Sequence, residues 1–209
     1  TTTICGTDVH ILKGEYPVAK GLTVGHEPVG VIERLGRAVD GYEEGQRVIA
    51  GAICPNFNSY AAQDGAPSQD GSYLMNAGAC GAHGFKATAG WRFGNLIDGT
   101  QAECVLVPDA TANLAPIPDG LTDEQVLMCP DIMSTGFKGA ENANIQIGDT
   151  VVVFAQGPIG LCATAGARLQ GATTIIAVDG NNHRLEISKR LGADVTLNFQ
   201  NCDVVDEVM

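Results

Sequence analysis

The side chains best suited to chemistry lie near the start of this chain, where a thiol is followed by an imidazole and a carboxyl group. Cys5 precedes His26 by twenty-one residues, and Glu27 comes directly after the histidine. Thiolate and imidazole are ligands that Zn²⁺ prefers, and a catalytic zinc needs about three protein ligands and an open position. A single cysteine or histidine is more often a packing or surface residue, so the prediction of a metal site depends on the whole pattern.

Three glycines accompany these side chains at fixed distances. Gly25 directly precedes His26, and Gly30 and Gly36 follow within 29–39, where β-branched runs predict a strand, a turn and a second strand. The ungapped pattern resembles the zinc signature of the medium-chain, zinc-dependent alcohol dehydrogenases. This resemblance implies an α/β protein with a β-barrel, in which a GroES-like catalytic domain precedes a Rossmann domain that binds a nicotinamide cofactor.

The first half of the chain has the composition of a compact barrel-like domain. Short β-branched runs at 46–50 and 103–107 predict further strands, and glycines and prolines separate them. Residues 56–90 contain few aliphatic side chains and many small or amide ones. We therefore expect a long loop excursion between the predicted strands.

Strands and helices alternate in the second half. Thr122 and Gln125 predict a helix start with a capping box. A continuous apolar strand typical of a buried parallel sheet is predicted over 150–155, with further strands over 174–178 and 195–198. Helices are predicted over 122–128, 135–141, 159–169, 184–191 and 203–208. This order predicts the first half of a doubly wound parallel sheet. We expect the GroES-like domain over 1–134 and the Rossmann domain over 135–209, without the family's first strands and its carboxy-terminal third.

A glycine-rich turn follows the first predicted strand of the second domain. Gly157 and Gly160 fit two glycines of the G-x-G-x-x-G pattern, with Ala155 in place of the first, and such a turn offers backbone N–H groups to a pyrophosphate. Asp179, at the end of the next strand, can accept hydrogen bonds from ribose and would repel a 2′-phosphate, which favours NAD over NADP. The alternative role of Asp179 is a helix N-cap, compatible with either cofactor. The candidate cofactor residues are Thr135, Gly157, Pro158, Ile159, Gly160 and Asp179.

A fourth metal ligand is expected near the junction of the two domains. Counting back four residues from Thr135, where most of the family has a cysteine, leads to Asp131 and not to Cys129. The family's bacterial secondary-alcohol dehydrogenases use aspartate there, and the chain also resembles them over 89–93 and 130–141. Cys129 is assigned to packing, with a ligand role as the alternative. The implied zinc ligands are Cys5, His26 and Asp131, with Glu27 able to enter or leave the coordination shell.

Roles in the reaction follow from the same resemblance. Thr7 would hold the substrate oxygen through its hydroxyl, and His10 would pass the proton outward, because imidazole titrates near neutral pH. Asp8 is expected to orient a neighbouring group. The expected catalytic residues are Thr7, His10 and Glu27, and the expected substrate-pocket residues are Ala52 and Trp91.

Composition limits the partners and the compartment. The chain has 24 acidic and 12 basic residues and a formal net charge of −12, which argues against nucleic acid or an anionic membrane as partner. No apolar run is long enough to span a bilayer and no signal peptide is visible, so a cytoplasmic location is expected. The seven cysteines are irregularly spaced, which predicts reduced thiols. Because only Cys80 lies between Cys54 and Cys104, we expect one catalytic zinc and no structural zinc.

The leading prediction is a zinc-dependent, NAD(P)-linked alcohol dehydrogenase that transfers hydride between NAD(H) and small secondary alcohols or ketones. By family habit it would be a homo-oligomer, a dimer or a tetramer. One alternative keeps the fold and changes the substrate to a polyol or another alcohol. The other is a non-catalytic, zinc-stabilised fragment.

Overall fold

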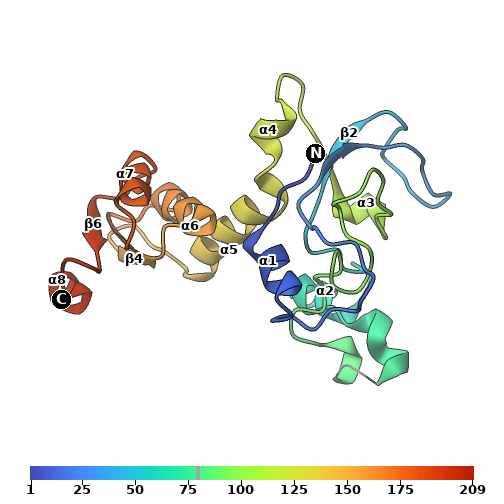
Figure 1. Cartoon of the computed structure of the whole chain (residues 1–209), viewed down its shortest axis with the longest axis horizontal. Coiled ribbons are helices and arrows are strands. Elements are labelled where there is room, and N and C mark those ends of the chain that lie inside the picture. Colours follow the sequence, from blue (N-terminus) through green and yellow to red (C-terminus); the bar gives the residue numbers. More distant parts are fainter. Residues whose placement is uncertain (79–80) are drawn as a thin grey trace. The chain divides into compact units, whose positions relative to one another are not determined.

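The computed structural model describes residues 1–78 and 81–209, and Figure 1 shows their arrangement. The chain divides into two compact units, Thr1–Asp131 and Ile132–Met209. The predicted domain boundary follows residue 134, whereas the units divide after residue 131. Among the described residues, no helix combines the length and the apolar character that crossing a bilayer requires.

Unit 1 contains a small antiparallel sheet in the order β1-β2-β3. Strand β1 (Val29–Val31) pairs with β2 (Arg47–Ala50), and β2 pairs on its other side with β3 (Leu114–Pro116). The second strand predicted within 29–39 is not formed, because the chain from residue 32 onward is a loop that turns back and leads into β2.

The core of unit 1 takes side chains from the coil as well as from the sheet. Phe93 and Cys54 are fully buried, and Val105 and Val107 pack against them. The prediction of a strand over 103–107 is wrong. This segment pairs with no described strand, and an extended chain without a hydrogen-bonded neighbour is not a stable strand. Its alternate apolar side chains still contribute to the core.

Short helices complete unit 1. Helix α4 begins at the predicted cap, where the Thr122 hydroxyl and the Gln125 side chain bond each other's backbone N–H groups. Among its described residues, the excursion over 56–90 holds one short α-helix and three short 3₁₀ helices. The helical elements are α1 (Gly6–Leu12), α2 (Tyr60–Gln63), η1 (Pro67–Gln69), η2 (Ser72–Ala77), η3 (Ala82–Gly84), α3 (Ala110–Asn113), α4 (Asp123–Val126) and the π-helical turn η4 (Cys129–Met133), which ends in unit 2.

Unit 2 is a parallel sheet in the order β4-β5-β6 with helices between its strands. This confirms the predicted half of a doubly wound fold. The strands are β4 (Thr150–Phe154), β5 (Thr174–Asp179) and β6 (Val195–Asn198), and the helices are α5 (Ser134–Asn142), α6 (Pro158–Leu169), α7 (Asn182–Arg190) and α8 (Val204–Val208).

The central strand of unit 2 explains the two layers around its sheet. Ile175 and Ala177 of β5 pack into one cluster with residues of α5, α6 and α7. Ile176 and Val178 pack into another, with Val204 and Val208 of α8 beside it. Successive side chains of a strand point to opposite faces, so one buried strand supplies both clusters.

Candidate metal centre

Cys5 is held at the start of α1 by a carboxylate from the first turn of that helix. Its backbone N–H donates to Asp8 Oδ2 at 2.8 Å. Gln101 Nε2 donates to the same oxygen at 3.0 Å and to the Thr3 carbonyl at 3.2 Å. Asp8 is 3% exposed. A buried carboxylate therefore ties the thiol-bearing residue to a segment 93 residues away in sequence from Asp8.

The backbone at Gly25 places His26 in the same region. Gly25 has φ +103°, and a Cβ there would lie 2.7 Å from the backbone nitrogen of Gln101. The Gly25 carbonyl accepts a hydrogen bond from the Thr100 N–H at 2.9 Å. Only glycine meets both conditions, because other residues rarely adopt this φ and none has room for its Cβ. The glycine of the signature is thus explained by close packing of the segment at 100–101.

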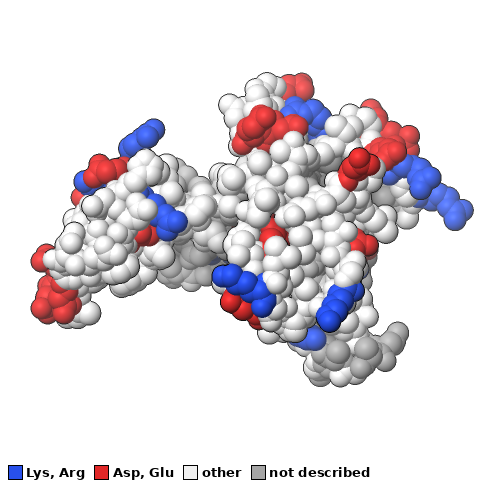
Figure 2. Space-filling view, in the orientation of Figure 1, with Lys and Arg blue, Asp and Glu red and all other residues white. Residues whose placement is uncertain are grey.

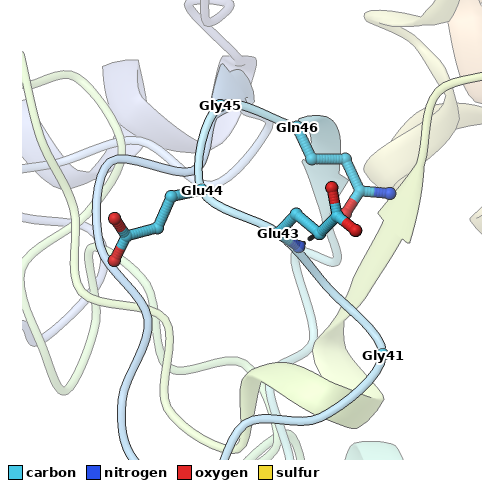
Figure 3. A pocket seen from close by; sticks show the side chains of 5 residues that line it. All are labelled: Gly41, Glu43, Glu44, Gly45 and Gln46. Carbon is cyan, nitrogen blue, oxygen red and sulfur yellow. Dashed lines mark hydrogen bonds between the residues drawn. The ribbon is translucent and has the colours of Figure 1, made fainter.

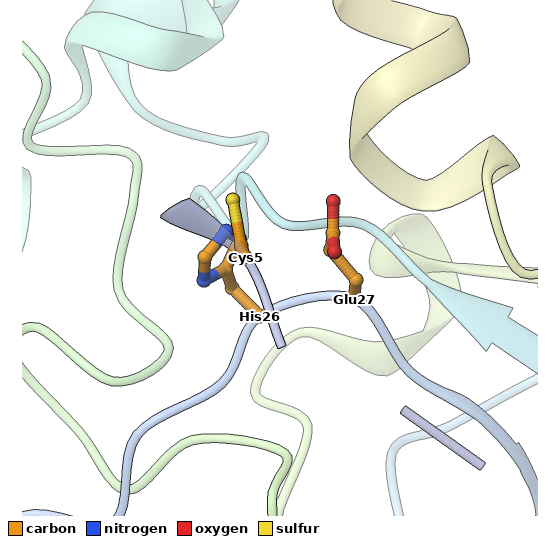
Figure 4. Close-up of side chains that lie close together, drawn as sticks. All are labelled: Cys5, His26 and Glu27. Carbon is orange, nitrogen blue, oxygen red and sulfur yellow. The ribbon is translucent and has the colours of Figure 1, made fainter. Parts of the chain in front are cut away.

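The predicted ligand side chains come together in unit 1. One ligand atom from each of Cys5, His26 and Glu27 lies within 4.8 Å of the others, and Figure 4 shows the three side chains on neighbouring stretches of chain. His26 and Glu27 are 4% and 2% exposed. Asp131 Oδ2 lies 3.6 Å from His26 Nε2. A thiol, an imidazole and a carboxyl group therefore form one cluster, and a second carboxyl group lies beside the imidazole.

The electrostatics of this cluster favour a cation. Burial, together with the nearby charges of Asp131 and Asp8, raises the pKa of Glu27 to about 7. Glu27 Oε1 and His26 Nδ1 are buried without a hydrogen-bond partner, although Glu27 Oε2 accepts from Thr3 Oγ1. Buried polar atoms normally have partners. The donor types match those of zinc, and a cation would relieve the repulsion among the carboxylates, so these residues fit the metal.

Asp8 also faces the imidazole. Its Oδ1 lies 3.8 Å from His26 Nδ1, while the other ring nitrogen faces Asp131. Histidine ligands of metals commonly present their second nitrogen to a carboxylate, which fixes the ring orientation. The expectation that Asp8 orients a neighbour is consistent with these distances, and the contact of Asp8 with Gln101 is a part of the site that the sequence did not indicate.

Other predicted site residues surround the cluster. Thr7 Oγ1 lies 3.6 Å from Cys5 Sγ. The ring of Trp91 lies edge-on to that of His26, with centroids 5.9 Å apart, and its buried Nε1 has no hydrogen-bond partner. Ala52 is buried, and its N–H donates to the Pro130 carbonyl at 3.4 Å, which ties it to the neighbour of Asp131.

His10 differs from these residues because its side chain is half-exposed. Its ring contacts Tyr16 edge-on, with centroids 6.1 Å apart. The Tyr16 ring in turn lies edge-on to Trp91 at 5.9 Å. A row of aromatic side chains therefore joins the buried imidazole of His26 to the exposed one of His10.

The glycine-rich turn in unit 2 is built from backbone contacts. A Cβ on Gly160 would lie 1.8 Å from the Ala155 carbonyl oxygen, so α6 can pack here only with glycine. A Cβ on Gly157 would meet no atom within 4 Å, so there is open space beside the turn. Ala155, in the place of the first glycine, has φ 66° and is strained. A Cβ on Gly136 would lie 2.7 Å from the Ile159 carbonyl oxygen, so the first turn of α5, with Thr135, packs against α6.

Asp179 lies at the carboxyl end of β5, beside this turn. Its two oxygens accept hydrogen bonds from the backbone N–H groups of Gln156 at 2.6 Å and Asn181 at 2.7 Å. Burial would raise the pKa of Asp179, but these hydrogen bonds and Arg184, 3.8 Å away, outweigh it and lower the pKa. The carboxylate is therefore ionised at neutral pH, as an acceptor for a ribose must be.

Gln156 is a buried residue of the turn that sequence reasoning missed. Its side chain is fully buried, donates to the Val153 carbonyl at 3.0 Å and accepts from Thr164 Oγ1 at 3.0 Å. It fixes the turn to both the strand and the helix. No pattern in the sequence signals this, because the position is a variable one in the glycine motif.

A surface hollow of unit 1 lies apart from these residues. A hollow over Gly41, Glu43, Glu44, Gly45 and Gln46 (Figure 3) is an exposed turn that contains none of the candidate residues. On the face shown in Figure 2, Lys and Arg side chains lie scattered among Asp and Glu. None of the six described cysteines forms a disulfide, and Cys80 lies outside the described residues.

Family models and curated proteins match both halves of the chain. The model described as the alcohol dehydrogenase GroES-like domain matches residues 1–119, and the one described as zinc-binding dehydrogenase matches 158–209. The chain is 87% identical over 209 residues to an alcohol dehydrogenase of Cupriavidus necator, covering all of this chain and 57% of that protein. It is 35% identical to the NADP-dependent isopropanol dehydrogenase of Thermoanaerobacter brockii, covering 98% and 54%. The chain thus spans about half the length of these relatives.

Solved structures give the same result. The alcohol dehydrogenase TADH from Thermus sp. ATN1 matches with a TM-score of 0.81 and 31% identity, over 99% of this chain and 56% of that one. A zinc-binding dehydrogenase from Sinorhizobium meliloti, solved with NADP bound, matches with a TM-score of 0.80 and 29% identity, over 98% and 54%. Both likenesses extend over the two units described above.

Proposed function

Because this chain belongs to the zinc-dependent alcohol dehydrogenase family, we propose that it transfers hydride between a nicotinamide cofactor and small secondary alcohols or ketones. The observation that carries the proposal is the buried cluster of Cys5, His26 and Glu27, with Asp131 beside it. Zinc, when bound, supplies a Lewis acid that polarises a carbonyl or acidifies an alcohol. The relative from Thermoanaerobacter brockii, named as an isopropanol dehydrogenase, supports a small secondary alcohol as substrate.

Residues of this chain would bind the metal, bind the substrate and transfer the proton. Cys5, His26 and Asp131 would hold the metal, and Glu27 would enter or leave its coordination shell. Thr7, beside the Cys5 sulfur, would bind the substrate oxygen. His10, half-exposed, would move the proton to solvent.

The walls of the proposed substrate pocket lie close to the metal cluster. We assign them to Ala52 and Trp91, since Trp91 lies edge-on to the ligand imidazole. A half-buried indole and a methyl group would favour a small apolar substituent on the substrate carbon.

The cofactor preference is proposed on Asp179. Its ionised carboxylate, beside the open space at Gly157, would bind a ribose and repel a 2′-phosphate, which favours NAD. Two relatives favour the opposite preference, since one is named as NADP-dependent and the other was solved with NADP bound. The ratio of kcat/KM for NADH to that for NADPH tests it. A preference for NADPH would reject the role of Asp179.

Turnover tests the proposed reaction. The zinc-loaded protein should oxidise NADH in the presence of acetone or 2-butanone, and a panel of polyols and primary alcohols serves as comparison. No turnover on any member of a broad carbonyl and alcohol panel would reject the proposed activity. Turnover confined to polyols would keep the fold and change the substrate class.

The number of metal ions tests the proposed site. Zinc per chain after exhaustive dialysis should be close to one. A value close to two would mean that the segment between Cys54 and Cys104 binds a structural zinc, and a value close to zero would reject the ligand set. A homo-oligomer in the cytoplasm completes the proposal, and sedimentation of the purified protein tests the assembly.

A further inference from the structure

Helix α1 ends in a motif that turns the chain back onto His10. Gly14 has φ +76°, its N–H donates to the Ile11 carbonyl at 2.9 Å, and the N–H of Glu15 donates to the His10 carbonyl at 3.0 Å. These bonds form a Schellman motif, in which the residue after the glycine lies beside the residue five positions earlier. The backbone alone therefore places Glu15 against His10.

The side chains at these two positions also bond each other. Glu15 Oε2 contacts His10 Nδ1, and both side chains are 52% exposed. An ionised carboxylate can only accept, so Nδ1 must donate. A Schellman motif often carries an apolar contact at these positions, and here an imidazole and a carboxylate replace it.

Tyr16 restrains the same imidazole from another direction. Its ring lies edge-on to that of His10, with an interplanar angle of 88°, and edge-on to Trp91. The imidazole is thus held through Nδ1 by Glu15 and at its ring by Tyr16. Thr7 and His10 are three residues apart on α1, and residues at this spacing are neighbours on a helix surface.

We propose that Glu15 is a positioning residue for His10, holding it with Nδ1 protonated so that Nε2 is free to accept and release the proton of the reaction. The hydrogen bond made by one ring nitrogen decides which nitrogen carries the proton in the neutral ring. Exposed ion pairs contribute little to stability, so the purpose of the pair is orientation and not folding. The inference rests on the proposed function, because that function assigns proton transfer to His10 and the inference says which residue holds the His10 ring in place.

The experiment compares Glu15→Gln with the parent protein. Glutamine keeps the size of the side chain but lacks the charge, and its amide can donate as well as accept. Glu43→Gln is the matched control, since it removes an exposed carboxylate from another turn of the same unit. Kinetics with NADH and 2-butanone at fixed pH give kcat and KM, and ring ¹⁵N chemical shifts of His10 in the metal-free protein give its tautomer.

We expect Glu15→Gln to lower kcat by about tenfold, a part of what a general acid or base contributes, with KM nearly unchanged. The share of the Nδ1–H tautomer should fall in the same variant, while Glu43→Gln changes neither quantity. His10→Gln should lower kcat at least as much as Glu15→Gln.

Three results would overturn the inference, and the third would overturn the proposed relay as well. If the parent has the same tautomer mixture as Glu15→Gln, Glu15 does not position the ring, whatever the activity. If His10→Gln lowers kcat but Glu15→Gln does not, the positioning role also fails while the relay stands. If the parent turns over and His10→Gln leaves kcat unchanged, the relay of the proposed function is wrong and the inference falls with it.

Discussion

The two candidate sites of this chain are assembled in opposite ways. The metal centre in unit 1 joins side chains from residues 5, 26, 27 and 131, held by buried polar contacts such as that of Asp8 with Gln101. The glycine-rich turn in unit 2 lies within six residues and is shaped by the close approach of backbone atoms. We therefore expect the first site to fail when a charge or ligand is removed, and the second when a single Cβ is added.

The largest effect is expected at Gly160. Its Cβ in Gly160→Ala would overlap the Ala155 carbonyl oxygen, and such overpacking against backbone destabilises by about 3 kcal/mol or more. Thermal unfolding should show a strong loss of stability in unit 2. Gly157→Ala is the matched control, because its Cβ meets no atom within 4 Å. Equal stability of the two variants would contradict the close packing described here.

The next effect is expected at Asp131. Loss of a residue that only orients a ligand weakens metal binding by about 10–100-fold, and loss of a ligand should cost at least as much. Competitive titration with a zinc chelator should therefore show Asp131→Ala at or beyond this range, with Asp119→Ala, an exposed aspartate of the same unit, as control. Unchanged affinity in Asp131→Ala would move attention to Cys129 as the alternative ligand.

A smaller effect on zinc is expected from Asp8→Asn. The amide keeps an oxygen for the Cys5 N–H but removes the charge that faces His26 Nδ1, so zinc affinity should fall by about tenfold. The same chelator titration measures it, and circular dichroism checks the fold. A folded variant with parental affinity would mean that Asp8 serves only as a helix cap.

The smallest effect is a gain in unit 2. Ala155 has φ 66°, a conformation that glycine adopts without strain, so Ala155→Gly should stabilise the protein by up to about 1 kcal/mol. Denaturant unfolding measures the change, and Ala155→Ser, which keeps a Cβ, should show no gain. A loss of stability on Ala155→Gly would mean that the entropy of the unfolded chain outweighs the strain.

The same contrast explains what could be predicted from the sequence. The strands and helices of unit 2 follow predicted boundaries closely, since β4 and β5 are mainly apolar runs and local patterns determine such elements. In unit 1 the segment 103–107 has the same apolar character, yet it is not a strand, because tertiary pairing and not local pattern decides.

In the candidate sites, too, local sequence patterns could be predicted and tertiary contacts could not. Cys5, His26 and Glu27 could be predicted to lie together because a pattern of fixed spacing marks them, and their ligand atoms lie within 4.8 Å of one another. The contact of Gln101 with Asp8 was not predicted, because 93 residues separate the two in sequence. The burial of Gln156 was not predicted, because it occupies a variable position of the glycine motif.

The spacing of the metal ligands also bears on how the protein is made. Asp131 leaves the ribosome more than a hundred residues after Cys5, His26 and Glu27. With Asp131 as a ligand, a nascent chain could hold zinc only loosely until residue 131 has been synthesised. Tight metal capture would then follow the synthesis of that residue, before the strands of unit 2 have emerged.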